Sequence, residues 1–433
     1  MSNDVSDAPI LKKNLFRLFL LTFSGSIIYG LPYFRLYYYD TYQATYNLTN
    51  LQMGALGSAY GICGLFSYLL GGVLADKFKA KNLIVFSLIT TGLGGFLHLI
   101  YPTYTSILAV YAVWGVTSLL TFWPALIKEI RLQGSPKEQG RVYGLFEGGR
   151  GVVNAIHLAL ATAAFGVLLH KANGAMGIRG VIILYSVLTF AAGVLVFFFI
   201  TETATAAAVK ESKKFQWSEL VQVVKMPAVW LVTFLLCASY TFNMSFYYFT
   251  PYSTKVFGAT AVLGAVLTVL AQYCRPVAAT TAGFLGDRFG KSRLLIGGFS
   301  CMALATFAVL LIPGSASMVP VLIAACIVIY LAMYSNYGLF YALLEEGHVP
   351  IKVSGLAIGL ISTIGYIPEV LCPAIAGKLF DKYPGATGFK IYFTGMVCVA
   401  LIGAVLAFVW LRTYGTQREA SRKLASSLDP SES

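Results

Sequence analysis

The stretch GVLADKFKAK, residues 72–81, decides the architecture that we expect, because it recurs as GFLGDRFGKSR at residues 283–293. Asp76 in the first copy and Asp287 in the second are 211 residues apart (287 minus 76), close to half of the 433-residue chain. Each copy ends one long apolar run and is followed by another. The sequence therefore predicts two halves that repeat one structure.

The composition places both halves in a membrane. Hydrophobic residues make up 58% of the chain and charged residues 11%, and the mean hydropathy is +0.74, which is far above that of a water-soluble domain. A helix needs about 20 apolar residues to cross the hydrocarbon core, so the chain has room for about twelve crossings. The apolar runs are continuous, without the alternation of a barrel strand, and unpaired backbone groups are excluded in lipid. We therefore expect an all-α membrane protein with twelve transmembrane helices in two pseudo-symmetric six-helix bundles.

The apolar runs also set the expected domain boundaries. Residues 1–200 are predicted to form the N-terminal bundle, 201–226 a cytoplasmic linker with a surface helix, 227–412 the C-terminal bundle and 413–433 a cytoplasmic tail. The twelve spans are expected at about 15–42, 50–75, 83–101, 106–127, 140–169, 180–200, 228–252, 261–286, 294–312, 319–344, 353–380 and 390–411.

The positions of the basic residues predict the orientation. The net charge is +13, but the 31 Lys and Arg are not gathered in a patch for nucleic acid. With the N-terminus taken as cytoplasmic, 22 of them fall on that side and six on the other. Such a bias predicts that both termini are cytoplasmic. We expect a multi-pass protein of the plasma membrane, which is the inner membrane if the source is bacterial.

The repeated stretch also carries a family resemblance. The pattern Gly-x-x-x-Asp-Arg/Lys-x-Gly-x-Arg/Lys between the second and third spans resembles the signature loop of the major facilitator superfamily. The second copy has the internal Gly290, whereas the first has Lys79 in its place. The resemblance implies that the acidic and basic pair of each loop gates the transporter by bracing helix ends. The alternative is a basic loop that only sets orientation. The implied gating residues are Asp76, Lys77, Asp287 and Arg288.

The fifth span carries two distinct stripes. At 100° per residue its polar side chains fall within about 80° of one another. Small residues form a second stripe about a quarter-turn away and are expected to pack closely against a neighbouring helix. The polar stripe is Glu147, Arg150, Asn154 and His157, and the small stripe is Gly140, Gly144, Gly148 and Gly151.

Three arginines lie within predicted spans: Arg35, Arg150 and Arg275. A charge at mid-bilayer costs from ~3 to over 10 kcal/mol, so each of them needs a partner or a water-filled cavity. Arg35 has no acid at helical spacing except the poorly placed Asp40, and it lies among tyrosines, which suggests an anion site. Two alternatives stay open: Arg35 extends to the interface, and Arg150 forms a structural pair with Glu147.

A narrower resemblance bears on Arg35. It stands 41 residues before Asp76, a layout similar to that of the organophosphate–phosphate antiporter branch, in which a first-span arginine binds phosphate. That branch also has a seventh-span arginine. This chain has none at 240–252, and Arg275 of the eighth span is a possible substitute. The residues predicted to bind substrate are Arg35, Arg150, Arg275, Tyr33, Tyr37 and Asn336, the last from the polar interruption of the tenth span.

Proton coupling has three candidates. Glu369 lies in the eleventh span between Pro368 and Pro373, where we expect a kink. It is either a protonatable coupling site or a counter-charge for Arg150 or Arg275. Glu147 and His157 are the other candidates, although a lone histidine on an apolar helix is more often a hydrogen-bonded packing residue.

These patterns together predict a secondary transporter and no enzyme. The chain has no GxxxxGK[ST] motif for ATP, no cluster of nucleophile, base and acid, and no cysteine or histidine pattern typical of a metal site. No cofactor, metal or nucleic acid is expected. The partners that we expect are the lipid bilayer and a small organic anion of the sugar acid or sugar phosphate type. A proton or counter-anion gradient is expected to drive its transport, and the protein is expected to be a monomer. The alternatives are a proton-coupled transporter of neutral sugars or drugs, or a transport-inactive sensor on the same scaffold.

Overall fold

The structure is a computed structural model that describes residues 11–135, 138–201, 217–337, 339–340, 343–350 and 353–415. The regular elements of these residues are helices. In the first half they are α1 (Leu11–Ile27), α2 (Gly30–Tyr37), α3 (Tyr39–Tyr46), α4 (Asn50–Lys77), α5 (Ala80–Ile100), α6 (Tyr104–Gly115), η1 (Val116–Phe122), α7 (Trp123–Arg131), α8 (Gln139–Lys171) and α9 (Gly174–Phe199).

The second half follows the short helix α10 (Trp217–Val224). It contains α11 (Pro227–Ser245), η4 (Phe246–Tyr248), α12 (Phe249–Phe257), α13 (Ala261–Phe289), α14 (Lys291–Leu311), η5 (Ala316–Met318), α15 (Val319–Tyr337), α16 (Leu343–Glu346), α17 (Ser354–Gly365), α18 (Pro368–Lys382), α19 (Ala386–Trp410) and η8 (Leu411–Gly415). The predicted domain boundaries within the linker and the tail fall partly on residues 202–216 and 416–433, which lie outside the described residues.

Each predicted span coincides with a helix or with a run of consecutive helices. Among the described residues, ten helices are long and apolar enough to cross a membrane, and eleven when α1 and α2, which meet at a 44° bend, are taken as one span. The predicted second span corresponds to α4, a helix of 28 residues in which the side chains of residues 66–73 and 75–77, toward its C-terminal end, lie outside the described set. The predicted all-helical membrane fold is therefore confirmed.

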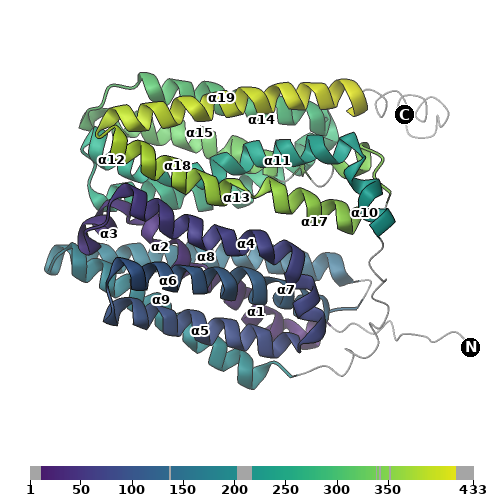
Figure 1. Ribbon diagram of the computed structural model, residues 1–433, viewed down its shortest axis with the longest axis horizontal. Coiled ribbons are helices and arrows are strands. Elements are labelled where there is room, and N and C mark those ends of the chain that lie inside the picture. The colour runs from purple at the N-terminus through teal and green to yellow at the C-terminus, as the bar shows by residue number, and fades with distance from the viewer. Residues whose placement is uncertain are drawn as a thin grey trace, which may run out of the picture.

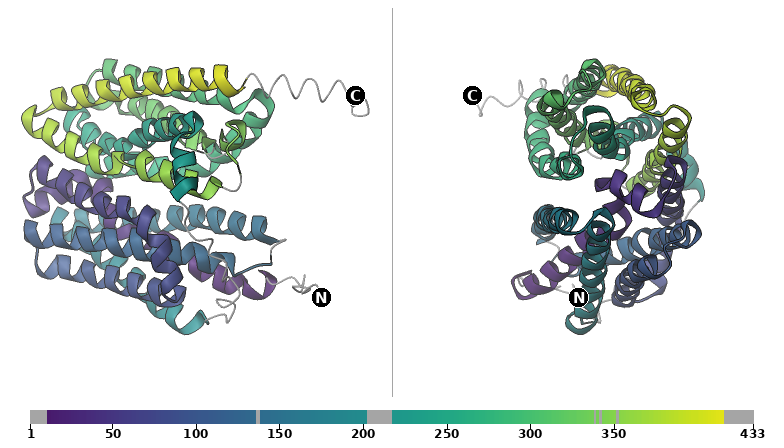
Figure 2. Two further views of the ribbon diagram at one scale, coloured as in Figure 1. Left: turned by 45° about the vertical axis from the view of Figure 1, so that its right-hand side comes forward. Right: turned by 90° about the vertical axis from the view of Figure 1, so that its left-hand side faces the viewer.

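The two halves form two bundles that lie side by side along the long axis of the molecule (Figures 1 and 2). The start of α1 and the end of α19 lie at one end, which we call the termini end. The turns before α4, α13 and α19 lie at the opposite end, which we call the far end (Figure 1). Long helices of both bundles run between these ends, so the surface between the bundles extends through the membrane.

The eleventh span is broken at its acid. α17 ends at Gly365 and α18 begins at Pro368, so the predicted kink is a break between two helices. A proline cannot donate the backbone hydrogen bond that would continue α17, but it is well suited to the first turn of a new helix. Glu369 therefore lies in the first turn of α18 rather than in the middle of a bent helix.

Polar contacts join the halves at the far end. Asp381 of α18 accepts hydrogen bonds from the backbone N–H groups of Asn50 and Leu51, at 2.9 and 2.7 Å, and from the Asn50 side chain at 2.8 Å. Lys255 of α12 forms an ion pair of 3.2 Å with Asp40 of α3. The first-turn N–H groups of a helix lack partners within that helix, so Asp381 closes the N-terminus of α4 from the opposite half.

Close backbone packing adds to this closure. A Cβ atom built on Gly54 of α4 would lie 2.2 Å from the backbone oxygen of Pro373 in α18. A Cβ on Gly377 would lie 2.4 Å from the backbone oxygen of Asn50. Only glycine permits such an approach, which is the role that small residues have between membrane helices. The far end is therefore closed in this structure.

The small stripe of α8, which lies toward the termini end, is not closely packed, and this contradicts one prediction. Nothing lies within 4 Å of a Cβ built on Gly144, Gly148 or Gly151 of α8, so this part of the small stripe does not pack against a neighbour. The same holds for Gly359 of α17. The side-chain surroundings of Gly140 lie outside the described set. The prediction is wrong for this conformation, because Gly144, Gly148 and Gly151 face open space.

Candidate functional site

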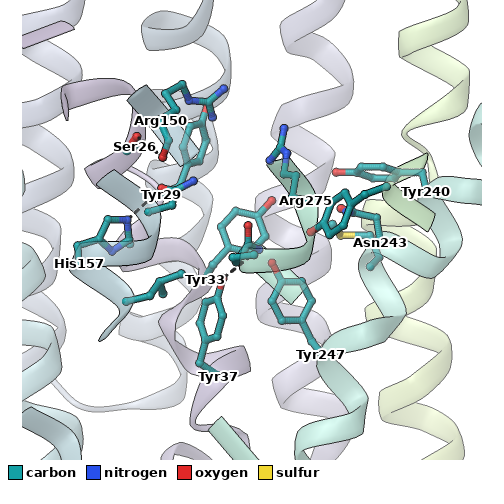
Figure 3. A pocket seen from close by; sticks show the side chains of 16 residues that line it. Ser26, Tyr29, Tyr33, Tyr37, Arg150, His157, Tyr240, Asn243, Tyr247 and Arg275 are labelled. Atoms are coloured by element: carbon teal, nitrogen blue, oxygen red, sulfur yellow. Dashed lines mark hydrogen bonds between the residues drawn. The ribbon is translucent and has the colours of Figure 1, made fainter. Parts of the chain in front are cut away.

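A polar cavity of about 180 Å³ lies between the halves, with side chains from both (Figure 3). Its lining is strongly aromatic and polar. The residues that line it are Ser26, Tyr29, Gly30, Tyr33, Tyr37, Arg150, Asn154, His157, Leu158, Tyr240, Asn243, Met244, Tyr247, Gln272, Arg275 and Tyr334. They come from α1, α2, the turn between these two helices and α8 in the first half, and from α11, η4, α13 and α15 in the second.

Two guanidinium groups reach this cavity, one from each half. Arg150 of α8 lies 4.8 Å from the ring centre of Trp123, and its side chain is 12% exposed. Arg275 of α13 is exposed and lies 5.8 Å from the ring centre of Tyr334. Figure 3 shows both in the upper part of the cavity, with Tyr37 and Tyr247 in the lower part. None of the described residues that line the cavity is acidic.

A second, adjoining pocket of about 190 Å³ continues from the same two arginines. It also contains Glu147, whose carboxylate accepts a 3.1 Å hydrogen bond from Arg150, one helical turn further along α8. The Glu147 side chain is 52% exposed. The predicted pair within α8 is therefore present, but Arg150 faces the cavity as well as its partner, so the pair does not remove it from the site.

Glu369 lies directly behind the lining of the cavity. Its carboxylate accepts a hydrogen bond from the Tyr33 hydroxyl of the first half and one of 2.9 Å from the Tyr240 hydroxyl of the second. The residue is 8% exposed, and it packs against Gly61 of α4, where a Cβ would lie 3.0 Å from its backbone. A buried carboxylate held by hydroxyls from both halves connects the cavity lining to the contact between the halves.

Both ring nitrogens of His157 are occupied. Nδ1 lies 3.1 Å from the Tyr185 hydroxyl, and Nε2 lies 3.0 Å from Oδ1 of Asn154. An amide oxygen only accepts, so Nε2 carries a proton and Nδ1 accepts from the tyrosine in this arrangement. The ring is buried but lines the cavity. The position of His157 is therefore compatible with a packing residue, and also with a proton relay in which the hydrogen bonds to Tyr185 and Asn154 are exchanged.

Two residues predicted to bind substrate are not in the lining. Arg35 is 3% exposed, its guanidinium lies 5.2 Å from the ring centre of Tyr111, and its Nε has no hydrogen-bond partner. A Cβ on Gly57 would lie 2.7 Å from its Nη2, so Arg35 is enclosed beside α4. Asn336 is fully buried and donates to the sulfur of Met302 at 3.6 Å. In this conformation neither is positioned to contact a molecule in the cavity.

The predicted gating residues lie mostly outside the described set. α4 contains Asp76 and Lys77, and α13 contains Asp287, but these three side chains lie outside the part of the chain that the structure describes. Arg288 is exposed and lies 5.3 Å from the ring centre of Phe289. Their gating role stays a prediction.

Several lining residues were not among the predicted binding residues, notably Asn243, Tyr247 and Gln272. Gln272 donates to the Tyr37 hydroxyl at 3.4 Å, and Tyr247 stacks on Tyr33 with ring centres 6.1 Å apart. Tyr247 belongs to the aromatic end of the seventh span, and Gln272 precedes Arg275 by one helical turn. Tyr247 lies in the run SFYYFTPY at residues 245–252, whose aromatic content resembles that of the stretch YGLPYFRLYYY at residues 29–39, so this likeness was a usable signal for Tyr247.

The fold and the cavity define a polytopic helical membrane protein with a polar site between two bundles. The sequence profile described as Major Facilitator Superfamily matches residues 18–367, which is more than half of the chain. The chain therefore belongs to the major facilitator superfamily. It is a secondary transporter and not an enzyme.

The chain is similar over nearly its whole length to two proteins of Escherichia coli strain K12. It is 29% identical to the inner membrane protein YihN over 417 residues, which cover 95% of this chain and 98% of the relative. It is 28% identical to the inner membrane protein YqcE, covering 91% and 93%. Among solved structures, a point mutant of the nucleoside transporter NupG superposes with a TM-score of 0.71 at 15% identity and covers 92% and 98%. That likeness shows the fold alone.

Proposed function

We propose that this transporter moves a small organic anion, of the sugar acid or sugar phosphate type, bound between Arg150 and Arg275. The observation that carries the proposal is the pair of guanidinium groups, one from each half, in a cavity without an acid among its described lining residues. Guanidinium offers a fixed fork of donors that matches carboxylate or phosphate oxygens. The tyrosines below them offer ring faces and hydroxyls to a sugar.

The position of the arginines favours alternating access. An anion that contacts both arginines makes favourable charge interactions with a residue of each half and so links the two halves across the cavity. Such a substrate would draw the halves together on the side of the glycines, while the far-end contacts would have to open. The driving force would be a proton or counter-anion gradient.

A set of three matched ligands tests the substrate class. D-glucose, D-glucuronate and glucose 6-phosphate share a ring and differ in charge. We expect the purified protein to be stabilised against heat by one or both of the anions and not by glucose, because a ligand that prefers the native state raises the apparent stability. Stabilisation by glucose with no response to either anion would contradict the proposal.

We also propose that Glu369 is the coupling acid. Replacement by Gln keeps a side chain of the same size that can bond to Tyr33 and Tyr240 but cannot change its charge. In proteoliposomes with an imposed proton gradient, we expect Glu369→Gln to lose uphill accumulation and its dependence on external pH, while downhill exchange continues. Tyr240→Phe removes one donor and keeps the acid, so it should retain the pH dependence. Unchanged uphill accumulation in Glu369→Gln would exclude this role and favour a purely structural acid.

Glu147 competes with the substrate for Arg150 in this proposal. An exposed i,i+3 pair contributes only about 0.2–0.5 kcal/mol, so Glu147→Gln should tighten anion binding by about two-fold or less. The same change should leave the binding of neutral sugars unchanged. Isothermal titration with glucuronate and glucose separates these outcomes, and weaker anion binding in the variant would instead make Glu147 part of the binding site.

One observation favours a second candidate function. Because Arg150 is paired with Glu147, the charge available to an anion is reduced, and the remaining lining is rich in tyrosine. A proton-coupled transporter of neutral sugars would fit that lining. The matched ligand set distinguishes the two candidates directly.

The orientation is part of the proposal. We propose that the termini end faces the cytoplasm, as the distribution of Lys and Arg predicts. The related E. coli proteins are named inner membrane proteins, which supports the same location here. This structure would then be open toward the cytoplasm and closed on the opposite side.

A further inference from the structure

A groove of about 670 Å³ runs between α8 and α13, separate from the central cavity. Small and branched aliphatic side chains form most of its walls, among them Ala163 and Val167 of α8 and Val266 and Val269 of α13. Val167 is 52% exposed, although both helices qualify as membrane spans. In a membrane, an exposed apolar wall of this kind is in contact with lipid.

The polar atoms at the inner end of the groove are already paired. The Tyr273 hydroxyl donates to the backbone oxygen of Ala155 at 3.1 Å, which links α13 to α8 there. The Thr162 hydroxyl pairs with that of Tyr38 at 3.1 Å. The groove thus offers apolar surface and few free hydrogen-bonding groups, which suits a hydrocarbon chain and not a polar solute.

The length of the groove matches one leaflet. Its lining on α13 extends from Val262 to Tyr273, and eleven residue steps of a helix cover about 16 Å. Half of a hydrocarbon core about 30 Å thick is about 15 Å. The groove therefore extends from the far-end interface to about the middle of the membrane.

The outer mouth of the groove is basic. His170 and Lys171, the last residues of α8, line it and are exposed, and none of its described lining residues is acidic. A lysine near the membrane surface contributes about 1 kcal/mol to the attraction of anionic lipid headgroups. We propose that the groove binds an anionic phospholipid of the far-end leaflet, with an acyl chain between α8 and α13 and its headgroup at His170 and Lys171.

The site would also bias the transport cycle. Its two walls belong to different halves, so the bound chain contacts both only while they lie at this separation. A ligand that binds one conformation better than another shifts the population toward it. The lipid would therefore favour the conformation that is closed at the far end, whatever the transported substrate is.

Native mass spectrometry tests the site. The full chain is reconstituted into nanodiscs with equal parts of phosphatidylglycerol and phosphatidylcholine and then released. We expect the wild type to retain phosphatidylglycerol preferentially. Ala163→Trp and Val266→Trp fill the groove from opposite walls and should each abolish retention. Lys171→Ala should keep a bound lipid but lower the preference for phosphatidylglycerol by about five-fold.

Matched controls separate the groove from the rest of the lipid-facing surface. Leu304→Trp adds the same ring at a 70% exposed position on α14, and Lys378→Ala removes an exposed lysine of α18 in the same half of the membrane. Both should retain lipid as the wild type does. Equal retention of the two lipids by the wild type, or retention unchanged by both tryptophans on the groove walls, would overturn the proposal.

Discussion

Arg275→Gln is expected to abolish the binding and uptake of the anion while the protein folds and inserts normally. The side chain is exposed to the cavity and forms no ion pair among the described residues, so its loss leaves no buried charge uncompensated. A hydrogen bond to a charged group contributes about 1.5–3 kcal/mol, which is about 10- to 150-fold in affinity. Uptake of glucuronate and glucose 6-phosphate into proteoliposomes, together with their thermal stabilisation of the variant, measures the effect.

Two further variants identify the cause of that loss. Arg275→Lys keeps the charge without the planar fork, so it should restore part of the affinity for either anion. Arg179→Gln removes an exposed arginine of α9 that is not among the residues lining the cavity, and it should behave as the wild type. If Arg275→Gln transports both anions at the wild-type rate, the anion does not bind between the two halves and the proposed function fails.

Asp381→Ala is expected to shift the protein toward a conformation that is open at the far end. The carboxylate accepts three hydrogen bonds from the start of α4 in the opposite half, where the helix dipole also favours a negative charge. The Lys255–Asp40 pair beside it is partly exposed, and such pairs contribute about 0–1 kcal/mol. Loss of the Asp381 bonds should cost about 2–3 kcal/mol of this closure, a shift of roughly 30- to 150-fold in the equilibrium.

Distances between spin labels report this shift directly. Labels at Ala44 in α3 and at Ser317 in η5, placed in a cysteine-free background, lie on opposite halves at the far end. We expect Asp381→Ala to populate longer distances, while Asp381→Asn should remain closer to the wild type because its amide oxygen still accepts hydrogen bonds. A distance distribution identical to that of the wild type would show that Asp381 is not needed to hold the far end closed.

Much of the fold could be predicted from the sequence, because membrane helices are coded by length and hydropathy. The doubled stretch around Asp76 and Asp287 predicted two halves. Pro368 predicted the interruption of the eleventh span beside Glu369, which became a break between α17 and α18. Each of these features depends on the residue types in one short stretch of sequence, so a single sequence is enough to predict it.

Which side of each helix faces the cavity was harder to predict from the sequence than where the helices begin and end. Arg150 and Arg275 reached the cavity as expected, but Arg35 is enclosed against Tyr111 and Gly57, and Asn336 is buried beside Met302. In a membrane bundle, lipid-facing and protein-facing sides are both apolar, so periodicity does not show which side meets the cavity. That choice is made by packing between the halves, which depends on the conformation.

Gly144, Gly148 and Gly151 have nothing against them in this structure, and an uncovered run of glycines lowers helix stability by about 1 kcal/mol per residue relative to alanine. A chain that adopted only this arrangement would gain from larger side chains there. We therefore regard these glycines as residues suited to an arrangement that is not seen here, in which another helix lies against α8. Close packing of a helix against this segment would then offset the helix stability that the glycines cost in the present arrangement.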